Sequence, residues 1–208
     1  MYTNTLAVKT AHLLKILSTK KWIQSFYLAG GTALALQYGH RQSIDLDFFC
    51  KKNINTKQLI QKLSVIGSFT LIQEEENTVE GILNGVKISF MTYPYILIQA
   101  VVSVEKYVFM AHKDDIAVMK LGAITGRNTK KDFIDLYWYM THEKKDMRDM
   151  ALLTEKKFNG FDFDMYHIYK SLVYFIEADK EPMPLMLESV KWNEVKDFFK
   201  NEIKHAMK

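Results

Sequence analysis

The chain is poor in the residues that cross-link or interrupt a protein. Its 208 residues include one cysteine, Cys50, with three prolines and nine glycines. A single cysteine excludes an internal disulfide, and a chain of this length buries roughly 70% of the surface that its unfolded form exposes. The scarcity of proline and glycine argues against long disordered linkers. We therefore expect a compact core that needs no covalent cross-link.

The chain also lacks the apolar runs that direct a protein into a membrane. The first residues show no basic segment followed by an apolar run and a cleavage site, and the apolar stretch 95–104 is too short to span a bilayer. Together with the single cysteine, this predicts a cytoplasmic protein with no membrane partner. The net charge of +4 permits an anionic partner without indicating one.

Hydrophobic periodicity divides the chain into an α/β part and a helical part. Helices are expected at 5–20, 32–39, 56–66, 114–125, 129–140, 146–157, 164–177 and 193–206. Strands are expected at 26–29, 44–49, 69–73, 79–83, 86–92 and partly within 96–110, with a hairpin turn at Asn84-Gly85. Gly126 is expected to interrupt its helix. The pattern predicts an α+β core of residues 1–111 and a helical C-terminal subdomain of residues 112–208.

Two aspartates stand in an otherwise apolar strand. Residues two apart in a strand point to the same face, so Asp45 and Asp47 are expected to project together, while Leu46 and Phe48 face the core. Their apolar neighbours, which include Ile44, favour a buried pair over a solvated one. Adjacent carboxylates repel each other, and an oxygen-preferring cation such as Mg²⁺ or Mn²⁺ relieves that repulsion most simply. The pair therefore predicts a metal site.

A glycine pair precedes the expected helix at 32–39. Without Cβ atoms, the backbone of Gly30 and Gly31 can approach phosphate oxygens at a helix N-terminus. Thr32 and Ser43 could add hydroxyl donors, and Arg41 could pair with a phosphate. A glycine pair alone is usually only a turn, but its place before two aspartates favours a nucleotide site.

A second polar cluster lies in the helical half. Lys120, Arg127 and Lys131 follow one another at intervals of seven and four residues, so a continuous helix would put them on one face. Asp132 and Asp135 are adjacent to them, and Lys131 could pair with Asp135. On spacing alone, a solvated face with weak ion pairs is the simpler interpretation.

These segments resemble a known family. The string GGTALAL…GHRQSIDLDFF is similar to the first signature of the AbiEii-type nucleotidyltransferases, a branch of the polymerase-β-like superfamily, and the run from Lys120 to Asp135 resembles their later motif. A looser likeness extends over 174–199. Many members are toxins of bacterial toxin–antitoxin or abortive-infection systems. The resemblance implies a polymerase-β-like core, in which a mixed sheet has flanking helices.

The resemblance also implies roles for individual residues. The nucleotide triphosphate would be held by the first motif at Gly30, Gly31, Thr32, Arg41 and Ser43, and the metal by Asp45 and Asp47. Lys120 would stabilise phosphate charge, Asp132 would act as a base or orient a partner, and Arg127, Lys131 and Asp135 would support them. The acceptor would be tRNA, another RNA or a protein, and a separately encoded antitoxin would be a partner.

The chain departs from the superfamily at one position. Where relatives carry a third carboxylate, the expected strand 86–92 has Ser89, which can neither take a proton nor complete a two-metal site as an acid does. Asp132 or Asp135 could supply the carboxylate, or one metal could suffice. We expect a metal-dependent transfer of a nucleoside monophosphate from an NTP to a hydroxyl. The alternatives are a non-catalytic nucleotide- or partner-binding module and an antibiotic-modifying nucleotidyltransferase.

Overall fold

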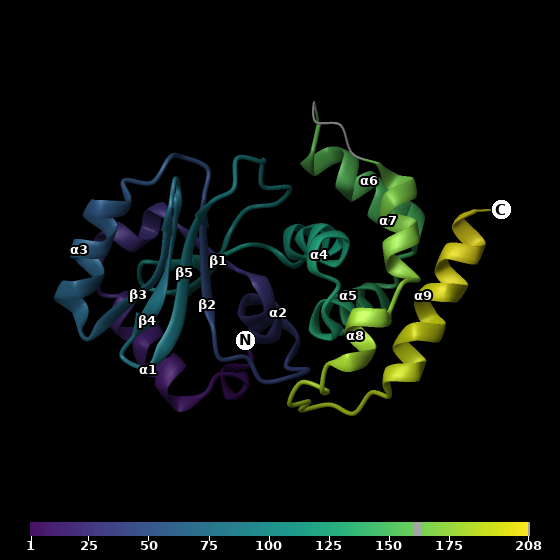
Figure 1. Ribbon diagram of the computed structural model, residues 1–208, viewed down its shortest axis with the longest axis horizontal. Helices are drawn as coiled ribbons and strands as arrows, with labels where there is room; N and C mark the ends of the chain where they lie inside the picture. Colours follow the sequence, from purple (N-terminus) through teal and green to yellow (C-terminus); the bar gives the residue numbers. More distant parts are fainter. Residues whose placement is uncertain (160–163, 208) are drawn as a thin grey trace.

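The computed structural model describes residues 1–159 and 164–207, and its centre is a mixed seven-stranded sheet (Figure 1). The strands are β1 (Tyr27–Ala29), β2 (Leu46–Cys50), β3 (Phe69–Glu75), β4 (Thr78–Leu83), β5 (Val86–Thr92), β6 (Val102–Glu105) and β7 (Val108–Met110). They lie in the order β3-β4-β5-β2-β1-β7-β6. The central strand β2 runs parallel to β5 and antiparallel to β1, and β1 runs parallel to β7.

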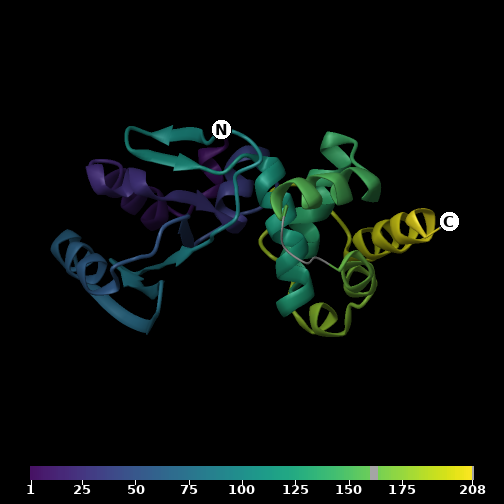
Figure 2. The ribbon, with the colours of Figure 1, turned by 90° about the horizontal axis from the view of Figure 1, so that it is seen from above.

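Helices cover the sheet and then form a second half of the molecule. They are α1 (Val8–Leu17), α2 (Gly30–Tyr38), α3 (Thr56–Ile66), α4 (Lys113–Arg127), α5 (Lys130–Glu143), α6 (Met147–Lys157), α7 (Met165–Leu172), α8 (Ile176–Lys180) and α9 (Trp192–Ala206), with 3₁₀ turns η1 (Thr3–Thr5) and η2 (Lys21–Ser25). Figures 1 and 2 show α4 to α9 gathered beside the sheet half. The predicted α+β organisation is confirmed. None of the described helices is both long and apolar enough to cross a membrane.

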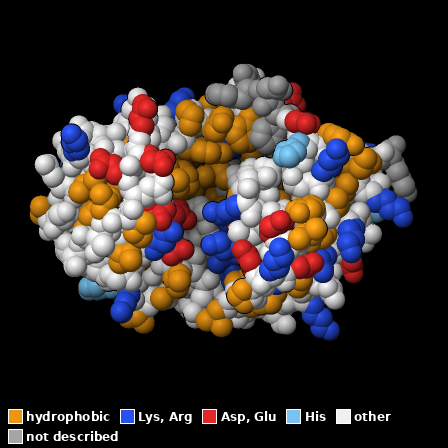
Figure 3. Space-filling view, in the orientation of Figure 1, with side chains coloured by type: hydrophobic (Ala, Val, Ile, Leu, Met, Phe, Trp, Pro, Cys, Tyr) orange, Lys and Arg blue, Asp and Glu red, His pale blue; other side chains and the backbone are white. Residues whose placement is uncertain are grey.

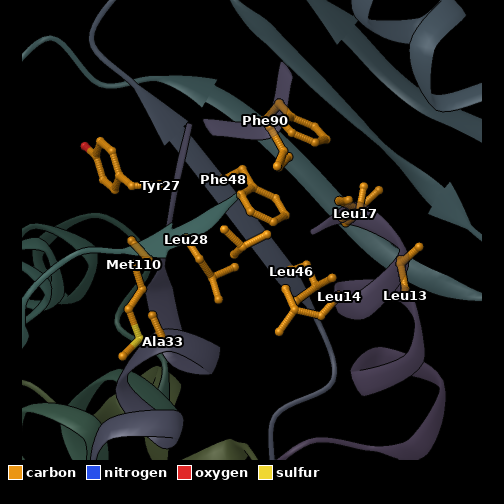
Figure 4. Close-up of a cluster of buried hydrophobic side chains, with 14 of the residues drawn as sticks. Leu13, Leu14, Leu17, Tyr27, Leu28, Ala33, Leu46, Phe48, Phe90 and Met110 are labelled. Carbon is orange, nitrogen blue, oxygen red and sulfur yellow. The ribbon is translucent and has the colours of Figure 1, made fainter. Parts of the chain in front are cut away.

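The core of the sheet half lies between the sheet and α1. Figure 4 shows Leu13, Leu14 and Leu17 of α1 beside Leu46 and Phe48 of β2, all of them buried. The alternation along β2 explains this packing, because every second side chain points to this face. The same alternation turns Asp47 to the opposite face.

A second core lies among the C-terminal helices, and the two cores interlock. Phe133 of α5 packs edge-on against Phe199 of α9, with ring centroids 5.7 Å apart. Ile98 belongs to this helical core, whereas Ile116 of α4 belongs to the sheet core. The division at residues 111 and 112 stays a prediction.

Several element boundaries differ from expectation. β2 begins at Leu46 rather than at Ile44, whose side chain is 61% exposed. Gly126 does not interrupt α4, which continues to Arg127 and is followed by Asn128 in the left-handed conformation (φ 51°). One exposed glycine costs a helix only about 1 kcal/mol, which the packing of α4 on α2 and α5 outweighs.

The single helix expected at 164–177 is two helices. α7 ends at Leu172, and α8 begins at Ile176. The bend between them places the ring centroid of Phe175 5.2 Å from that of Phe133 and 5.8 Å from that of Trp192. Aromatic packing therefore accounts for the break, which helical spacing alone did not reveal. The strand content expected within 96–110 is confirmed as β6 and β7.

Candidate active site

Asp47 lies at the centre of the sheet, on the face opposite the α1 core. It pairs with Ala29 of β1 on one side and with Ser89 of β5 on the other. The Ser89 hydroxyl donates a hydrogen bond of 2.6 Å to Asp47 Oδ1. Ser89 therefore occupies the neighbouring strand position at which the sequence predicted it, directly beside the metal-site candidate.

Asp45 lies just before β2, in irregular backbone. The Thr32 hydroxyl is hydrogen-bonded to the Asp45 carbonyl, and the Thr10 hydroxyl donates to the Ile44 carbonyl at 2.9 Å, so the segment is held without being a strand. Partial burial and the charge of Asp47 raise the pKa of the Asp45 carboxyl. The two carboxylates therefore repel each other.

The glycine pair is required by two close approaches. Gly30 has φ +67°, and a Cβ built on it would lie 2.7 Å from Asp47 Oδ2. A Cβ on Gly31 would lie 2.2 Å from Arg41 Nη2. Gly30 and Gly31 open α2, whose N-terminus receives no side-chain cap. The amides of its first turn thus remain available to an anion beside the aspartates.

Thr32 and Ser43 hold the backbone of the site. Their side chains are 1% and 9% exposed, and their hydroxyls are hydrogen-bonded to each other at 2.8 Å. The Ser43 amide also donates to the Thr5 carbonyl at 2.9 Å. Both hydroxyls therefore fix the segment that carries Asp45, rather than standing open to a triphosphate.

A cleft of about 360 Å³ separates the sheet half from α4. It is lined by Gly30, Asp47, Phe49, Met91, Tyr93, Ile116, Met119, Lys120, Gly122, Ala123, Gly126 and Arg127. Figure 3 shows the hollow between the two halves, with acidic side chains on the sheet side facing basic side chains on the helical side. One end of the cleft is thus charged, and the rest is largely apolar.

Behind the charged end lies a buried network of ion pairs centred on Asp135. Arg41 donates to it from Nε at 2.7 Å and from Nη2 at 2.8 Å. Lys120 Nζ lies 2.6 Å from Asp135 Oδ2 and 2.7 Å from Asp132 Oδ1. All four charged groups are at least 95% buried in their side chains. The guanidinium of Arg41, which was expected to meet a phosphate, is therefore committed to α5.

Asp132 has three partners of its own. Besides Lys120, it accepts from Arg127 Nε at 2.7 Å and from the Thr129 hydroxyl at 2.6 Å. Burial alone would raise the pKa of Asp132 and Asp135, but the cations beside them outweigh burial and hold both pKa values below the usual range. A carboxylate held this way is a poor proton acceptor. Its geometry fits positioning of Lys120 and Arg127 better than action as a base.

The cluster does not form the continuous helical face that its spacing suggested. Asn128 ends α4, so Lys120 and Arg127 lie on α4 while Lys131 lies on α5. Lys131 is exposed and makes no ion pair with Asp135 among the described residues, but its charge partly opposes the rise in the pKa of Asp45. The interpretation of a solvated face is wrong for the two aspartates, which are fully buried.

His40 belongs to the network, and sequence reasoning missed it. Its ring is fully buried, its Nε2 lies 2.8 Å from Asp135 Oδ1, and it stacks on Trp138 at 5.5 Å. Burial lowers the pKa of His40, so the neutral ring donates to the carboxylate. The sequence offered only its position next to Arg41 as a signal.

The fold and site define a class of protein. A mixed sheet that carries paired aspartates beside a glycine turn is found in the polymerase-β-like nucleotidyltransferases. The chain resembles the crystal structure of a candidate nucleotidyltransferase from H. pylori, with a TM-score of 0.57 and 17% identity over 97% of each chain. It also matches the Megavirus polyadenylate synthase, with a TM-score of 0.45 and 15% identity, over 63% of this chain and 31% of that one. The fold is the polymerase-β-like nucleotidyltransferase fold.

Sequence comparison identifies the family. The model of the AbiEii family, described as "Nucleotidyl transferase AbiEii toxin, Type IV TA system", matches residues 12–206. An uncharacterized protein of Aquifex aeolicus (strain VF5) is 37% identical over 190 residues, which cover 88% of each chain. This chain belongs to the AbiEii nucleotidyltransferase family, and the resemblance found in the sequence is confirmed.

Proposed function

We propose that this chain is a metal-dependent nucleotidyltransferase that moves a nucleoside monophosphate from an NTP to an acceptor hydroxyl, with RNA as the acceptor class. One observation carries the proposal: Asp47 lines the cleft against Gly30, where α2 begins without a side-chain cap, and Asp45 is close enough for the charge of Asp47 to raise its pKa. A toxin function in a toxin–antitoxin pair, with the antitoxin as partner, is part of the same proposal and rests on the family.

The donor set suits a cation that arrives with the nucleotide. Among the described residues, no group of three or more histidine, cysteine, aspartate or glutamate side chains could hold a metal alone. Mg²⁺ is commonly bound by one or two carboxylates together with substrate phosphates, which matches Asp45 and Asp47. Bound there, it would neutralise phosphate charge at the reacting centre. Burial and then the charge of Asp47 raise the pKa of Asp45, and a bound cation would offset both by favouring the ionised carboxylate.

The chain's own groups can bind and orient the triphosphate. The backbone N–H groups of Gly30 and Gly31 at the N-terminus of α2 have no side-chain cap, and the positive end of the helix dipole there favours a triphosphate. Arg127 has a 56% exposed side chain that also lines the cleft, so its guanidinium can meet the departing pyrophosphate. Lys120 lines the cleft behind Arg127, with its ammonium paired to Asp132 and Asp135. Lys131 can reach phosphate oxygens from solvent near Asp45.

The apolar part of the cleft offers a surface for the nucleobase. Phe49 and Tyr93 stand edge to face at 5.8 Å, and Met91 and Met119 complete the wall. Aromatic and thioether groups stack on any base and carry few hydrogen-bonding atoms. We therefore expect discrimination between bases to depend on size more than on their hydrogen-bonding edges.

Filling this cleft should block nucleotide binding without harming the fold. A Cβ added to Gly122 meets no atom within 4 Å, so Gly122→Leu places its side chain in the cleft. Replacing a helical glycine also favours α4 by up to about 1 kcal/mol. We expect the affinity for NTP, measured by calorimetry, to fall at least tenfold in Gly122→Leu, with the melting temperature unchanged or higher. Gly122→Ala is the matched control and should keep most of the affinity; equal affinity in all three proteins would place the nucleotide elsewhere.

A carboxylate at position 89 should strengthen metal binding. In Ser89→Asp, a third acid stands beside Asp47, which costs stability in the absence of metal because like charges repel. With Mn²⁺ present, we expect about tenfold tighter binding, equivalent to about 1.4 kcal/mol of added stability at saturation. Thermal unfolding with and without Mn²⁺ measures this stability. The uncharged variant Ser89→Asn is the control and should show no added stability in Mn²⁺ relative to the parent. An Mn²⁺ response no larger than that of the parent would contradict a metal site here.

The transfer reaction itself is tested with labelled nucleotides. The pure protein is incubated with each α-³²P-NTP, Mg²⁺ and total bacterial RNA, and parallel reactions contain an aminoglycoside or protein extract as acceptor. Label on RNA supports the proposal, and label on the aminoglycoside alone supports an antibiotic-modifying enzyme. Ser89 favours one rival, a nucleotide-binding module without catalysis, because it leaves the third acid position without a base. NTP binding with no label transfer to any acceptor would support that rival.

A further inference from the structure

A groove lies between η2 and α3, outside the nucleotide cleft. It consists of two cavities of about 450 and 360 Å³, one reaching the loop after β2 and the other the end of α3. Trp22, Gln58 and Lys62 line both cavities, so the two form one continuous groove. We call it the η2–α3 groove.

The charged side chains that line the η2–α3 groove are all basic. Its lining includes four lysines, Lys20, Lys51, Lys52 and Lys62, and no aspartate or glutamate. Within the described part of the chain, none of these lysines makes a salt bridge, whereas many other cations of the protein do. The acidic residues 74–76, at the end of β3 and in the turn after it, line neither cavity, although the next residue, Asn77, accepts a hydrogen bond from the Ile54 amide of the loop. Four ammonium groups in one groove, none with a carboxylate partner among the described residues, favour a polyanion.

The uncharged residues of the groove favour a nucleic acid over an acidic peptide. Trp22 is only partly buried, and it stands where the two cavities meet. Lys62 Nζ lies 5.7 Å from its ring centroid, so a phosphate bound there would sit beside an aromatic surface. Lysines along a groove with an aromatic platform are the combination that holds single strands, through phosphate contacts and base stacking. The side-chain N–H groups of Gln58 and Asn55 can donate to base edges, whereas the Asn55 oxygen caps α3 and the Gln58 oxygen accepts from Lys62.

We propose that the η2–α3 groove binds single-stranded RNA, with phosphates on the four lysines and a base against Trp22. The groove lies at the end of β2, the strand that carries Asp47: Lys51 follows Asp47 by four residues, about 13 Å along an extended chain. Cys50, which lines the groove, lies on the α1 face of the sheet, so a bound strand would have to pass the end of β2 to reach Asp47. That the bound RNA serves as the acceptor of the transfer rests on the proposed function. That the groove binds RNA does not depend on it.

Binding is measured without transfer, by fluorescence anisotropy of a labelled single-stranded RNA about ten nucleotides long, in EDTA and without NTP. In Lys51→Gln/Lys52→Gln we expect affinity to fall about tenfold at low salt. The slope of log affinity against log salt should flatten by about 1.4, since each lost lysine–phosphate contact contributes about 0.7. The control Lys200→Gln/Lys204→Gln removes the same charge from exposed positions on α9 and should match the parent.

A second readout uses the indole. RNA should quench the fluorescence of the parent and do so much less in Trp22→Phe, which keeps an aromatic ring in the core. Equal losses in the groove and control variants, equal quenching with and without Trp22, or displacement of RNA by polyglutamate at equal charge concentration would each overturn the groove assignment. Normal RNA binding without label transfer would instead refute only the enzymatic proposal, so the two failures are distinguishable.

Discussion

Asp45→Asn and Asp47→Asn should each reduce nucleotidyl transfer by about 100- to 1000-fold or more, the range found when one charge-stabilising group is removed from an active site. The reason is that each variant removes one of the two carboxylates on which the proposed metal site depends. The same variants should bind NTP·Mg²⁺ weakly, while the cleft and its apolar wall remain intact. Growth arrest on induced expression, if it follows from transfer, should disappear with the activity.

The fold should not suffer, and this separates a catalytic role from a structural one. Burial and Asp47 raise the pKa of Asp45, so its ionised form opposes folding. That cost is absent while the carboxyl is protonated and grows as pH rises above about 4, the unfolded value. Asp45→Asn should therefore be as stable as the parent at pH 3 and somewhat more stable at pH 7. Thermal unfolding at both values measures this.

The control is Asp197→Asn, which changes an acid with a 67% exposed side chain in a surface pair. It should leave transfer and growth arrest unchanged. Transfer that persists in both Asp45→Asn and Asp47→Asn would refute the assignment of the site. A large loss of stability in either variant would show that these acids hold the fold instead.

Asp135→Asn should cost about 3–5 kcal/mol of stability, because it leaves Arg41 and Lys120 buried beside an uncharged group. For a protein of this size the melting temperature should fall by roughly 10 °C. Urea unfolding at pH 7 measures the free energy directly. Asp197→Asn again serves as the control, since an exposed pair is worth at most about 1 kcal/mol. A loss no greater than that of the control would mean that the network adds little.

The stability difference between the parent and Asp135→Asn should depend on pH in one direction only. Burial opposes ionisation of Asp135, but Arg41 and Lys120 outweigh it and hold its pKa well below the usual range. The stabilisation is therefore complete above the unfolded pKa of about 4 and is lost as pH falls through the native value. The gap between the parent and Asp135→Asn should be constant from pH 6 to 7 and narrow only below about pH 4.

The local parts of the site were readable from the sequence. The period of two in a strand predicted that Asp47 would oppose Leu46 and Phe48, and the glycine pair predicted a close backbone approach. The start of the strand was misjudged because Ile44 is apolar yet exposed, held by neighbouring hydrogen bonds rather than by burial. Ser89 could be placed because a hairpin turn sets the register of β5.

The long-range parts were not readable. Arg41 and Asp135 meet across 94 residues, and no spacing rule reports such a pair. The helical spacing of Asp132 and Asp135 indicated a solvated face. That interpretation failed because the cations that neutralise these aspartates come partly from other elements, and helical spacing does not report such contacts. The cleft wall around Tyr93 and Met119 carries no polar pattern and became recognisable only when the sheet and α4 were seen together.

The central claim is that Asp45 and Asp47 hold a cation at the nucleotide cleft. Crystals grown with Mn²⁺ and a non-hydrolysable NTP analogue allow the most direct test, an anomalous difference map at the manganese absorption edge. We predict a peak between the two carboxylates, with the triphosphate against the first amides of α2. A bound nucleotide with no manganese at these carboxylates, or manganese bound elsewhere, would contradict the account.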